Sequence, residues 1–475
     1  MSADSTRAIV PPYSEAIVQD RSPAAHALRG IGHRLAKFAG PAAVAAYDRT
    51  MYPARVERPA MEAIRHIDTA VADSSRPAPT KPRVVHIIGS LAAGGAERQL
   101  ATYVAAAHAR GLATHSVVTF SPSVGEAAHF RPVLEAAGVS VRALGDAASS
   151  TALTRVRTDA ALRSRLLAIP PELGIEAMEC AGEILAADAD IVHAWLDHTN
   201  IVGGIAGLAA GAPRVILSLR SLSPPHFPAW HRPWMLPWYQ ALATSLRVRI
   251  AANSKMGALD YAQWMGVESS RIEVVHNGLD PAQFAATDAV SVARLRTELG
   301  ATGRRLVVGV FRIGDEKMPH HFAHIARRVL RELPDTLFVI AGDGPMREEL
   351  ARATEDLGAS FQLLGRRSDV ATLFAAAQAT LLCSRVEGLP NVLIEAQFLG
   401  CPVVATDAGG APETFVDGAT GFLHPIGAVS AMADSLVRLL RDDSLHAKFS
   451  AEARAFATDR FGLDAVVRST HALYA

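Results

Sequence analysis

The sequence predicts an α/β protein with two doubly wound domains, each containing a parallel sheet covered by helices on both faces. Short apolar strands alternate with helical segments, which is the pattern of such sheets. The alternation occurs twice, on either side of a turn-rich segment. The length of 475 residues allows two large domains and an extension, and 49% hydrophobic with 20% charged content is ordinary for globular proteins.

Residues 1–80 are predicted to be an N-terminal extension, because they are rich in Pro, Ser, Ala and Arg and show no clear strand. Residues 25–47 are a candidate helix, although Pro41 interrupts it. This extension could be poorly ordered or packed on the body of the protein. The alternative is a helix that lies on a membrane surface.

The first domain is predicted to cover residues 81–280. A glycine-containing loop after the first strand opens a helix from Gly94 to about His108, and residues 151–187 are a mostly helical insertion. The predicted strands are 84–88, 115–120, 139–143, 191–193, 215–219, 249–252 and 272–275.

The second domain is predicted to cover residues 281–475. The boundary lies at His276–Pro281, where Asn-Gly and Asp-Pro pairs are typical of turns. Ligands of doubly wound sheets bind beyond the carboxyl ends of the strands. The predicted strands are 306–311, 337–341, 361–364, 380–382 and 403–405.

Charge and cysteine content exclude several classes of function. Lys and Arg total 47 against 47 Asp and Glu, so electrostatics gives no reason to expect nucleic acid. Cys180, Cys383 and Cys401 are too few and too scattered for a disulfide framework or zinc site, which favours reduced thiols in the cytoplasm. No apolar run approaches the ~20 residues that span a bilayer, and no residue spacing indicates a metal site.

The segment from Arg385 to Glu395 is the most informative part of the chain. Pro390 suits the first turn of a helix, so Glu387 lies in the preceding loop and Glu395 about one turn into the helix. Backbone N–H groups and the helix dipole favour a phosphate there. Ionised carboxylates accept hydrogen bonds from sugar hydroxyls. The segment therefore predicts a ligand with sugar rings flanking a diphosphate, such as a nucleotide sugar.

The same segment resembles the E-x7-E signature of the retaining glycosyltransferases of family 4, which have the GT-B fold. The match continues through Gly400–Thr406 and Gly409–Glu413. The resemblance implies two Rossmann-like domains facing each other across a cleft, with a last helix near residues 463–473 that crosses back to the first domain. It also implies that Glu387 contacts the transferred sugar and that Glu395 holds the ribose. The backbone that would meet phosphate and sugar is that of Gly388, Leu389, Pro390, Asn391 and Val392.

Basic residues that follow other predicted strands also fit a nucleotide-sugar donor. In the family, an R-x4-K pattern binds the diphosphate, and it matches Arg312 and Lys317. Two fixed cations stabilise the charge that develops as the diphosphate departs. Arg366 follows the strand where the family seats the base, but a surface basic pair with Arg367 is an equal alternative.

The loop containing Gly94 and Gly95 permits close backbone approach. It lacks the G-x-G-x-x-G pattern, so nicotinamide binding is disfavoured. By resemblance, these two glycines face the donor phosphates and the acceptor.

The catalytic histidine is less clear. Many family members carry H-x-H after the fourth strand, but Trp195 stands where the second histidine would be. His198 is the favoured catalytic candidate, in an H-x-W-x-x-H form of the motif, and His193 is the second. His193 could instead be a buried strand-end residue.

Three of the five tryptophans, Trp230, Trp234 and Trp238, lie in one proline-rich segment. They could pack in the core. The alternative is an exposed aromatic surface for a lipid-linked acceptor, with peripheral contact to the inner face of a membrane.

The sequence therefore predicts a cytoplasmic, retaining hexosyl- or N-acetylhexosaminyl-transferase that needs neither a metal nor a cofactor. A UDP-linked donor, a glycan or lipid-linked glycan acceptor and a role in polysaccharide biosynthesis are expected. The departing phosphate would itself accept the acceptor's proton. The alternatives are a catalytically silent GT-B domain acting as an assembly partner, or an epimerase or phosphorylase of the same fold.

Overall fold

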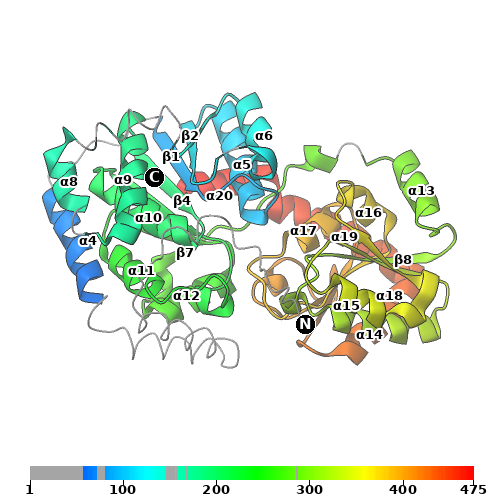
Figure 1. Cartoon of the computed structure of the whole chain (residues 1–475). Coiled ribbons are helices and arrows are strands. Elements are labelled where there is room, and N and C mark those ends of the chain that lie inside the picture. Colours follow the sequence, from blue (N-terminus) through cyan, green and yellow to red (C-terminus); the bar gives the residue numbers. More distant parts are fainter. Residues whose placement is uncertain are drawn as a thin grey trace, which may run out of the picture.

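The computed structural model describes residues 57–71 and 81–475, apart from residue 123 and short gaps within 146–157, at 167–168 and at 285–286. The predicted helix at 25–47 lies outside the described residues. Two parallel sheets form two domains that lie side by side (Figure 1). The prediction of two doubly wound α/β domains is confirmed.

The first sheet has seven strands in the order β3-β2-β1-β4-β5-β6-β7. Its order reverses between β1 and β4, and ligands of doubly wound folds bind at such a point. The strands are β1 (Arg83–Ile88), β2 (Thr114–Thr119), β3 (Ser140–Ala143), β4 (Ile191–Trp195), β5 (Arg214–Leu219), β6 (Val248–Ala252) and β7 (Ile272–Val274).

Helices cover both faces of this sheet because neighbouring strand residues point to opposite sides. In β1, Val85 and Ile87 belong to one buried cluster, whereas Val84 and Ile88 belong to another. The first cluster packs beneath α8 (Ala160–Leu166), α9 (Pro171–Ala186), α10 (Asp197–Ala209), α11 (Met235–Thr244) and α12 (Lys255–Met265). The second lies beneath α5 (Gly95–Ala109) and α6 (Arg131–Ala136).

The second sheet has six strands in the order β10-β9-β8-β11-β12-β13, with its reversal between β8 and β11. Its edge strand β13 was not predicted. The strands are β8 (Arg305–Val310), β9 (Thr336–Ala341), β10 (Phe361–Gly365), β11 (Ala379–Leu382), β12 (Val403–Thr406) and β13 (Gly421–His424). The helices are α13 (Ala289–Glu298), α14 (Pro319–Glu332), α15 (Arg347–Ala353), α16 (Val370–Ala376), α17 (Asn391–Phe398), α18 (Val429–Arg441), α19 (Asp443–Phe461) and α20 (Leu463–Ala472).

Part of the predicted N-terminal extension belongs to the first domain. Helix α4 (Glu57–Val71) buries Ala60, Ile64 and Ile67 against the core shared with α10 and α11. These residues recur at helical spacing and form one apolar stripe. The carboxylate of Asp68 on the same helix also accepts a hydrogen bond from Arg247 at 2.7 Å. Residues 57–71 of the predicted extension therefore pack on the body of the first domain.

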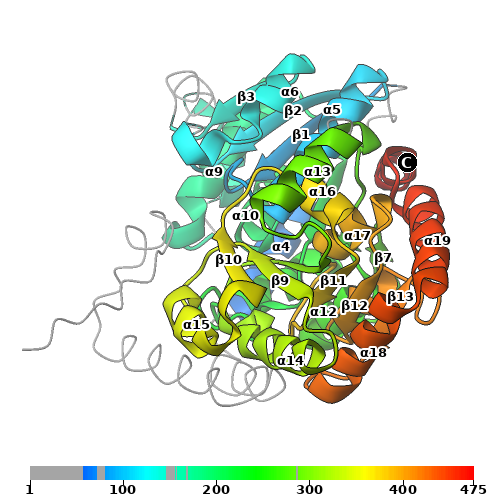
Figure 2. The same ribbon diagram turned by 90° about the vertical axis from the view of Figure 1, so that its right-hand side faces the viewer.

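The chain returns to the first domain at its C-terminal end. Leu279 pairs with Gly462 at the start of α20, and α20 packs against α5. Tyr474 shares a hydrogen bond of 2.9 Å with His193 of β4. Figure 2 shows α18 and α19 along one side of the second domain, with the C-terminus beyond them. The last helix thus fastens the two domains together.

The predicted surface of three exposed tryptophans is wrong for Trp238, which is 2% exposed in the core. Helix α11 begins at Met235 and takes Pro237 into its first turn, where proline is tolerated. The helix therefore continues and turns Trp238 inward. Trp234 is partly buried against the same core, and Trp230 is 62% exposed. Among the described residues, no helix is both long and apolar enough to cross a membrane.

We expect Trp238→Ala to lower the stability of the first domain by about 3–5 kcal/mol, because truncating a buried aromatic leaves a cavity. Trp230→Ser is the matched control and should change stability by less than about 0.5 kcal/mol. Denaturant unfolding followed by circular dichroism measures both variants. Equal effects of the two substitutions would contradict the assignment of Trp238 to the core.

Candidate functional site: charged residues at the interface of the domains

The topology brings Lys317 and Glu387 together. Lys317 ends a 3₁₀ turn, η5 (Asp315–Lys317), after β8, and Glu387 lies in the loop after the neighbouring strand β11. The Nζ atom of Lys317 donates to Glu387 Oε1 at 2.6 Å, and Ser384 Oγ donates to the same oxygen at 2.5 Å. Glu387 is 8% exposed. An ammonium group and a carboxylate are thus fixed at the switch point of the second sheet.

Arg312 precedes Lys317 in the same loop but points elsewhere. Its guanidinium forms an ion pair of 3.0 Å with Glu316, and the side chain is 57% exposed. The guanidinium is therefore exposed and paired within its own loop, and no described ion pair joins it to Glu387.

Glu395 faces the first domain. It lies in α17 with a nearly buried side chain, and Arg98 of α5 forms an ion pair with it. Arg98 follows the loop of Gly94 and Gly95, so this ion pair brings the glycine loop opposite α17. A Cβ on Gly95 would lie 3.3 Å from the side-chain nitrogen of Asn391. The predicted glycines and the predicted ribose-binding carboxylate therefore lie near each other where the two domains meet.

The domains contact each other at glycines that leave no room for a larger side chain. A Cβ on Gly388 would lie 2.8 Å from the carbonyl oxygen of Arg220, and one on Gly410 would lie 2.7 Å from Ser254 Cβ. Real Cβ atoms do not approach other heavy atoms this closely. Asn277 spans the same interface by donating to Asn391 Oδ1 at 2.6 Å. The loop after β11 thus lies directly on the first domain.

Glu413 makes a further bridge between the domains. Its carboxylate accepts hydrogen bonds from the backbone N–H of Lys255 at 2.8 Å and Met256 at 3.0 Å, at the N-terminus of α12. His276 Nε2 lies 2.9 Å from the same carboxylate. Burial acts to raise the pKa of Glu413, but the hydrogen bonds from His276 and the two amides outweigh it, so the pKa lies below its usual value. A negative charge at a helix N-terminus is stabilising.

The remaining predicted donor residues lie around this loop. Pro390 immediately precedes α17 as its N-cap rather than lying within the first turn, and Val392 follows in that turn. The side chain of Leu389 is buried with Leu279 and Ile394, so its backbone is the part that remains near the cleft. Arg366 is exposed after the edge strand β10, outside the cluster of Lys317 and Glu387.

His193 is buried, and both ring nitrogens have partners. Nε2 is hydrogen-bonded to Ser218 at 2.7 Å, and Nδ1 to Tyr474 at 2.9 Å. Burial lowers the pKa of His193 well below its usual value. Trp195 stacks on this ring and donates its indole N–H to His86 at 3.2 Å. These contacts match the alternative of a satisfied strand-end histidine.

His198 lies in the first turn of α10, at the carboxyl end of the first sheet. Its Nε2 lies 2.6 Å from the carboxylate of Glu176, and the side chain is 41% exposed. Phe120 and Trp234 contact the ring edge-on. All three partners belong to the first domain.

Sequence reasoning missed several residues of the interface. Arg98 lies four residues after Gly94, but the sequence gave it no predicted role, and Glu413 ends the matched segment Gly409–Glu413 without a predicted partner. A charged residue next to a matched motif was the available signal in both cases. Arg220 and Asn277 lie in no matched motif and gave no such signal; Arg220 binds Asn277 within the first domain, and Asn277 binds Asn391 of the second.

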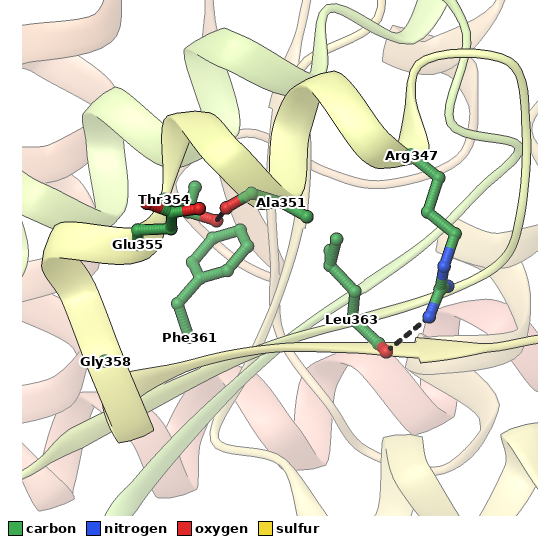
Figure 3. Close-up of a pocket in the computed structure, with 7 residues that line it drawn as sticks. All are labelled: Arg347, Ala351, Thr354, Glu355, Gly358, Phe361 and Leu363. Carbon is green, nitrogen blue, oxygen red and sulfur yellow. Dashed lines mark hydrogen bonds between the residues drawn. The ribbon is translucent and has the colours of Figure 1, made fainter.

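A cavity of about 280 Å³ opens elsewhere in the second domain, between α15, the 3₁₀ segment η6 (Glu355–Ser360) and β10 (Figure 3). Arg347 lines it and donates to the carbonyl oxygen of Leu363 at 3.1 Å. None of the predicted site residues lines this cavity. Among the described residues, no group of three or more His, Cys, Asp or Glu is positioned to hold a metal ion.

Two family models match the chain, one in each domain. "Glycosyltransferase Family 4" matches residues 93–283, and "Glycosyl transferases group 1" matches residues 293–456.

Curated relatives of the chain agree with the two family models. The Vi polysaccharide biosynthesis protein VipC/TviE of Salmonella typhi is 31% identical over 316 residues, which is 64% of this chain and 54% of that protein. The chain thus spans about half the length of this relative. The GDP-mannose-dependent alpha-(1-6)-phosphatidylinositol monomannoside mannosyltransferase of Mycolicibacterium smegmatis is 30% identical over 297 residues, 58% of this chain and 74% of that protein.

Solved structures share the fold. Anabaena Alr3699/HepE in complex with UDP aligns with a TM-score of 0.66 and 24% identity, covering 82% of this chain and 98% of that one. WaaG, a glycosyltransferase involved in lipopolysaccharide biosynthesis, aligns with a TM-score of 0.58 and 16% identity, covering 83% and 99%. The predicted GT-B fold is confirmed, and the chain belongs to the family 4 type of GT-B glycosyltransferases.

Proposed function

We propose that this chain is a retaining glycosyltransferase. It moves a hexosyl or N-acetylhexosaminyl group from a UDP-linked donor to a glycan or lipid-linked glycan during polysaccharide biosynthesis. The observation that carries the proposal is the pair of nearly buried carboxylates, each held by a cation. Glu387 is held by Lys317, and Glu395 is held by Arg98 across the cleft.

The charges fit a departing nucleoside diphosphate. As the bond between the sugar and the phosphate oxygen breaks, its electron pair stays on that oxygen, and negative charge accumulates. Lys317, Arg312 and the N-terminal end of α17 would stabilise this charge more in the transition state than in the bound donor. Glu387 would accept hydrogen bonds from the sugar, and Glu395 from the ribose, after exchanging Arg98 for hydroxyl groups.

Retention requires the acceptor to attack from the face that the phosphate leaves. The acceptor oxygen would form the new bond to the anomeric carbon, and the departing phosphate oxygen would take its proton. No protein carboxylate then has to act as the nucleophile. Glu387 and Glu395 would then only accept hydrogen bonds, from Lys317 and Arg98 before the donor binds and from its hydroxyl groups afterwards.

The relatives support a nucleotide-sugar donor and a glycan product. One relative is a UDP-Gal:alpha-D-GlcNAc-diphosphoundecaprenol alpha-1,3-galactosyltransferase of Escherichia coli, 26% identical over 264 residues. Solved structures of HepE contain UDP and UDP-glucose. The mycobacterial relative uses GDP-mannose, so GDP-linked donors belong in the same donor screen.

The acceptor side of the proposal lies in the first domain. His198, paired with Glu176, is the proposed catalytic histidine, since it is exposed at the cleft end of the sheet whereas His193 is buried. Trp230, stacked with Phe227 on the surface, is proposed to make the peripheral membrane contact near a lipid-linked acceptor. The three buried free cysteines agree with a cytoplasmic enzyme.

A screen of UDP- and GDP-sugars tests the proposal directly. The purified protein should hydrolyse or transfer sugar from at least one donor, and the product should keep the donor's anomeric configuration by NMR. Donor binding without any turnover would favour a catalytically silent GT-B domain. An inverted product would contradict the retaining mechanism.

We expect Arg312→Ala and Lys317→Ala each to lower kcat by at least about 100-fold, the effect typical of losing one transition-state donor. Steady-state kinetics with the preferred donor measures this loss. Arg328→Ala is the matched control, because Arg328 pairs with Asp434 at the surface of the same domain. Near-normal turnover in a folded Arg312 or Lys317 variant would contradict its role.

Activity should survive EDTA, because the proposed cations and helix terminus neutralise the diphosphate. The rate after chelation and desalting should stay within about twofold of the untreated rate, since the stabilising charges are covalently part of the chain. Loss of turnover that magnesium or manganese restores would show that a metal contributes to the phosphate site.

A further inference from the structure

Arg220 lies centrally where the two domains meet, and the proposed mechanism gives it no role. It follows β5 directly, so it lies at the carboxyl end of the first sheet. Its guanidinium carbon lies 5.1 Å from the centroid of the Trp195 ring. Its backbone oxygen contacts Gly388, where an added Cβ would lie 2.8 Å away. Arg220 is therefore at the point where the first domain meets the loop of Glu387 and Gly388.

The charge of Arg220 is not compensated. Three other cations of the cleft have carboxylate partners: Arg98 pairs with Glu395, Arg312 with Glu316 and Lys317 with Glu387. Arg220 forms no ion pair with any residue that the structure describes, and its guanidinium donates a hydrogen bond to the neutral amide oxygen of Asn277.

The surroundings of Arg220 make this unpaired charge costly. Its Nε atom is shut off from solvent and has no hydrogen-bond acceptor among the described residues. Burial lowers the pKa of its guanidinium to about 10, which still leaves it charged at neutral pH. Arg220 is half-buried, and a cation shielded from solvent without a counter-ion is energetically unfavourable. An anion that enters the cleft would remove this penalty.

The neighbours hold the guanidinium in place but cannot neutralise it. Trp195 uses its indole N–H to bind His86, so it offers Arg220 the face of its ring. Asn277 is itself fixed, because its amide nitrogen donates to Asn391. A stacked and hydrogen-bonded guanidinium is preorganised, and its planar fork matches two phosphate oxygens.

We propose that Arg220 binds the donor phosphate next to the transferred sugar, as a third cation contributed by the opposite domain. This inference rests on the proposed function. When the bond between the anomeric carbon and the phosphate oxygen breaks, the electron pair stays on that oxygen beside Arg220. The acceptor oxygen forms the new bond, and its proton passes to the departing phosphate. Arg220 is thus a residue that couples phosphate binding to contact between the domains.

The test compares ligands that differ by one phosphate. Isothermal titration of the full chain with UDP, UMP and uridine gives the contribution of the terminal phosphate, and GDP, GMP and guanosine replace them if GDP binds more tightly. Arg220→Met removes the charge and keeps the length of the side chain. Arg131→Met is the matched control, since Arg131 pairs with Glu135 on the surface of the same domain.

We expect Arg220→Met to raise the Kd of UDP at least about tenfold, the effect of about 1.4 kcal/mol. The Kd of UMP should rise less than that of UDP, and the Kd of uridine should not change. Donor hydrolysis should fall by about 100-fold in kcat. The Tm should not fall, because an apolar side chain replaces an unpaired charge. Arg131→Met should bind UDP as the wild type does.

Arg220→Lys provides a second variant if the methionine variant does not fold. It keeps the charge and loses the planar fork, so the Kd of UDP should rise by less than in Arg220→Met but stay above the wild-type value. UDP affinity within twofold of wild type in a folded variant would overturn the inference. So would an equal loss of UDP and UMP binding, or unchanged UDP binding with a raised KM for the acceptor. If the wild type binds neither UDP nor GDP, the proposed function fails, and this inference fails with it.

Discussion

The close approach of the two domains at glycine is the constraint on which the site depends. Gly388 and Gly410 let the loops after β11 and β12 lie on the backbone of Arg220 and the side chain of Ser254. Larger residues at these positions would hold the domains apart. Without this contact, the cations of the first domain could not reach the carboxylates of the second, so the E-x7-E loop would be an isolated acidic surface.

The second consequence of the contact is electrostatic. Glu387 and Glu395 are nearly buried, and a buried carboxylate is tolerated only with a charged or hydrogen-bonding partner. Lys317 supplies one partner from within the domain, and Arg98 supplies the other from across the cleft. The two carboxylates are therefore each balanced by a cation. When a donor binds, its hydroxyl groups can replace the cations at the carboxylates, and its phosphates can pair with the cations. The site is preformed, so the donor does not have to order these side chains.

Sequence reasoning predicted the architecture well because strand and loop signals are local. The strand alternation, the position of Glu387 before a helix and the order of the two domains all follow from neighbouring residues. It failed where residues far apart in the sequence make contact, and where packing in the folded protein determines whether a segment is helical. Arg98 and Glu395 are separated by 297 positions, so no local pattern pairs them. Trp238 is turned inward by a helix that proline seemed to forbid, and α4 is a packed helix within a proline-rich region. The short edge strand β13 also lacks a long apolar run.

Hydrogen exchange measured with and without saturating UDP tests the central claim that the donor binds between the domains at this loop. Exchange reports local opening, and a bound ligand slows it in the segments that it contacts. The account predicts slower exchange on both sides of the cleft, in residues 384–399 of the second domain and in residues 92–98 and 218–222 of the first. Protection confined to the cavity around Arg347, or to one domain alone, would contradict it.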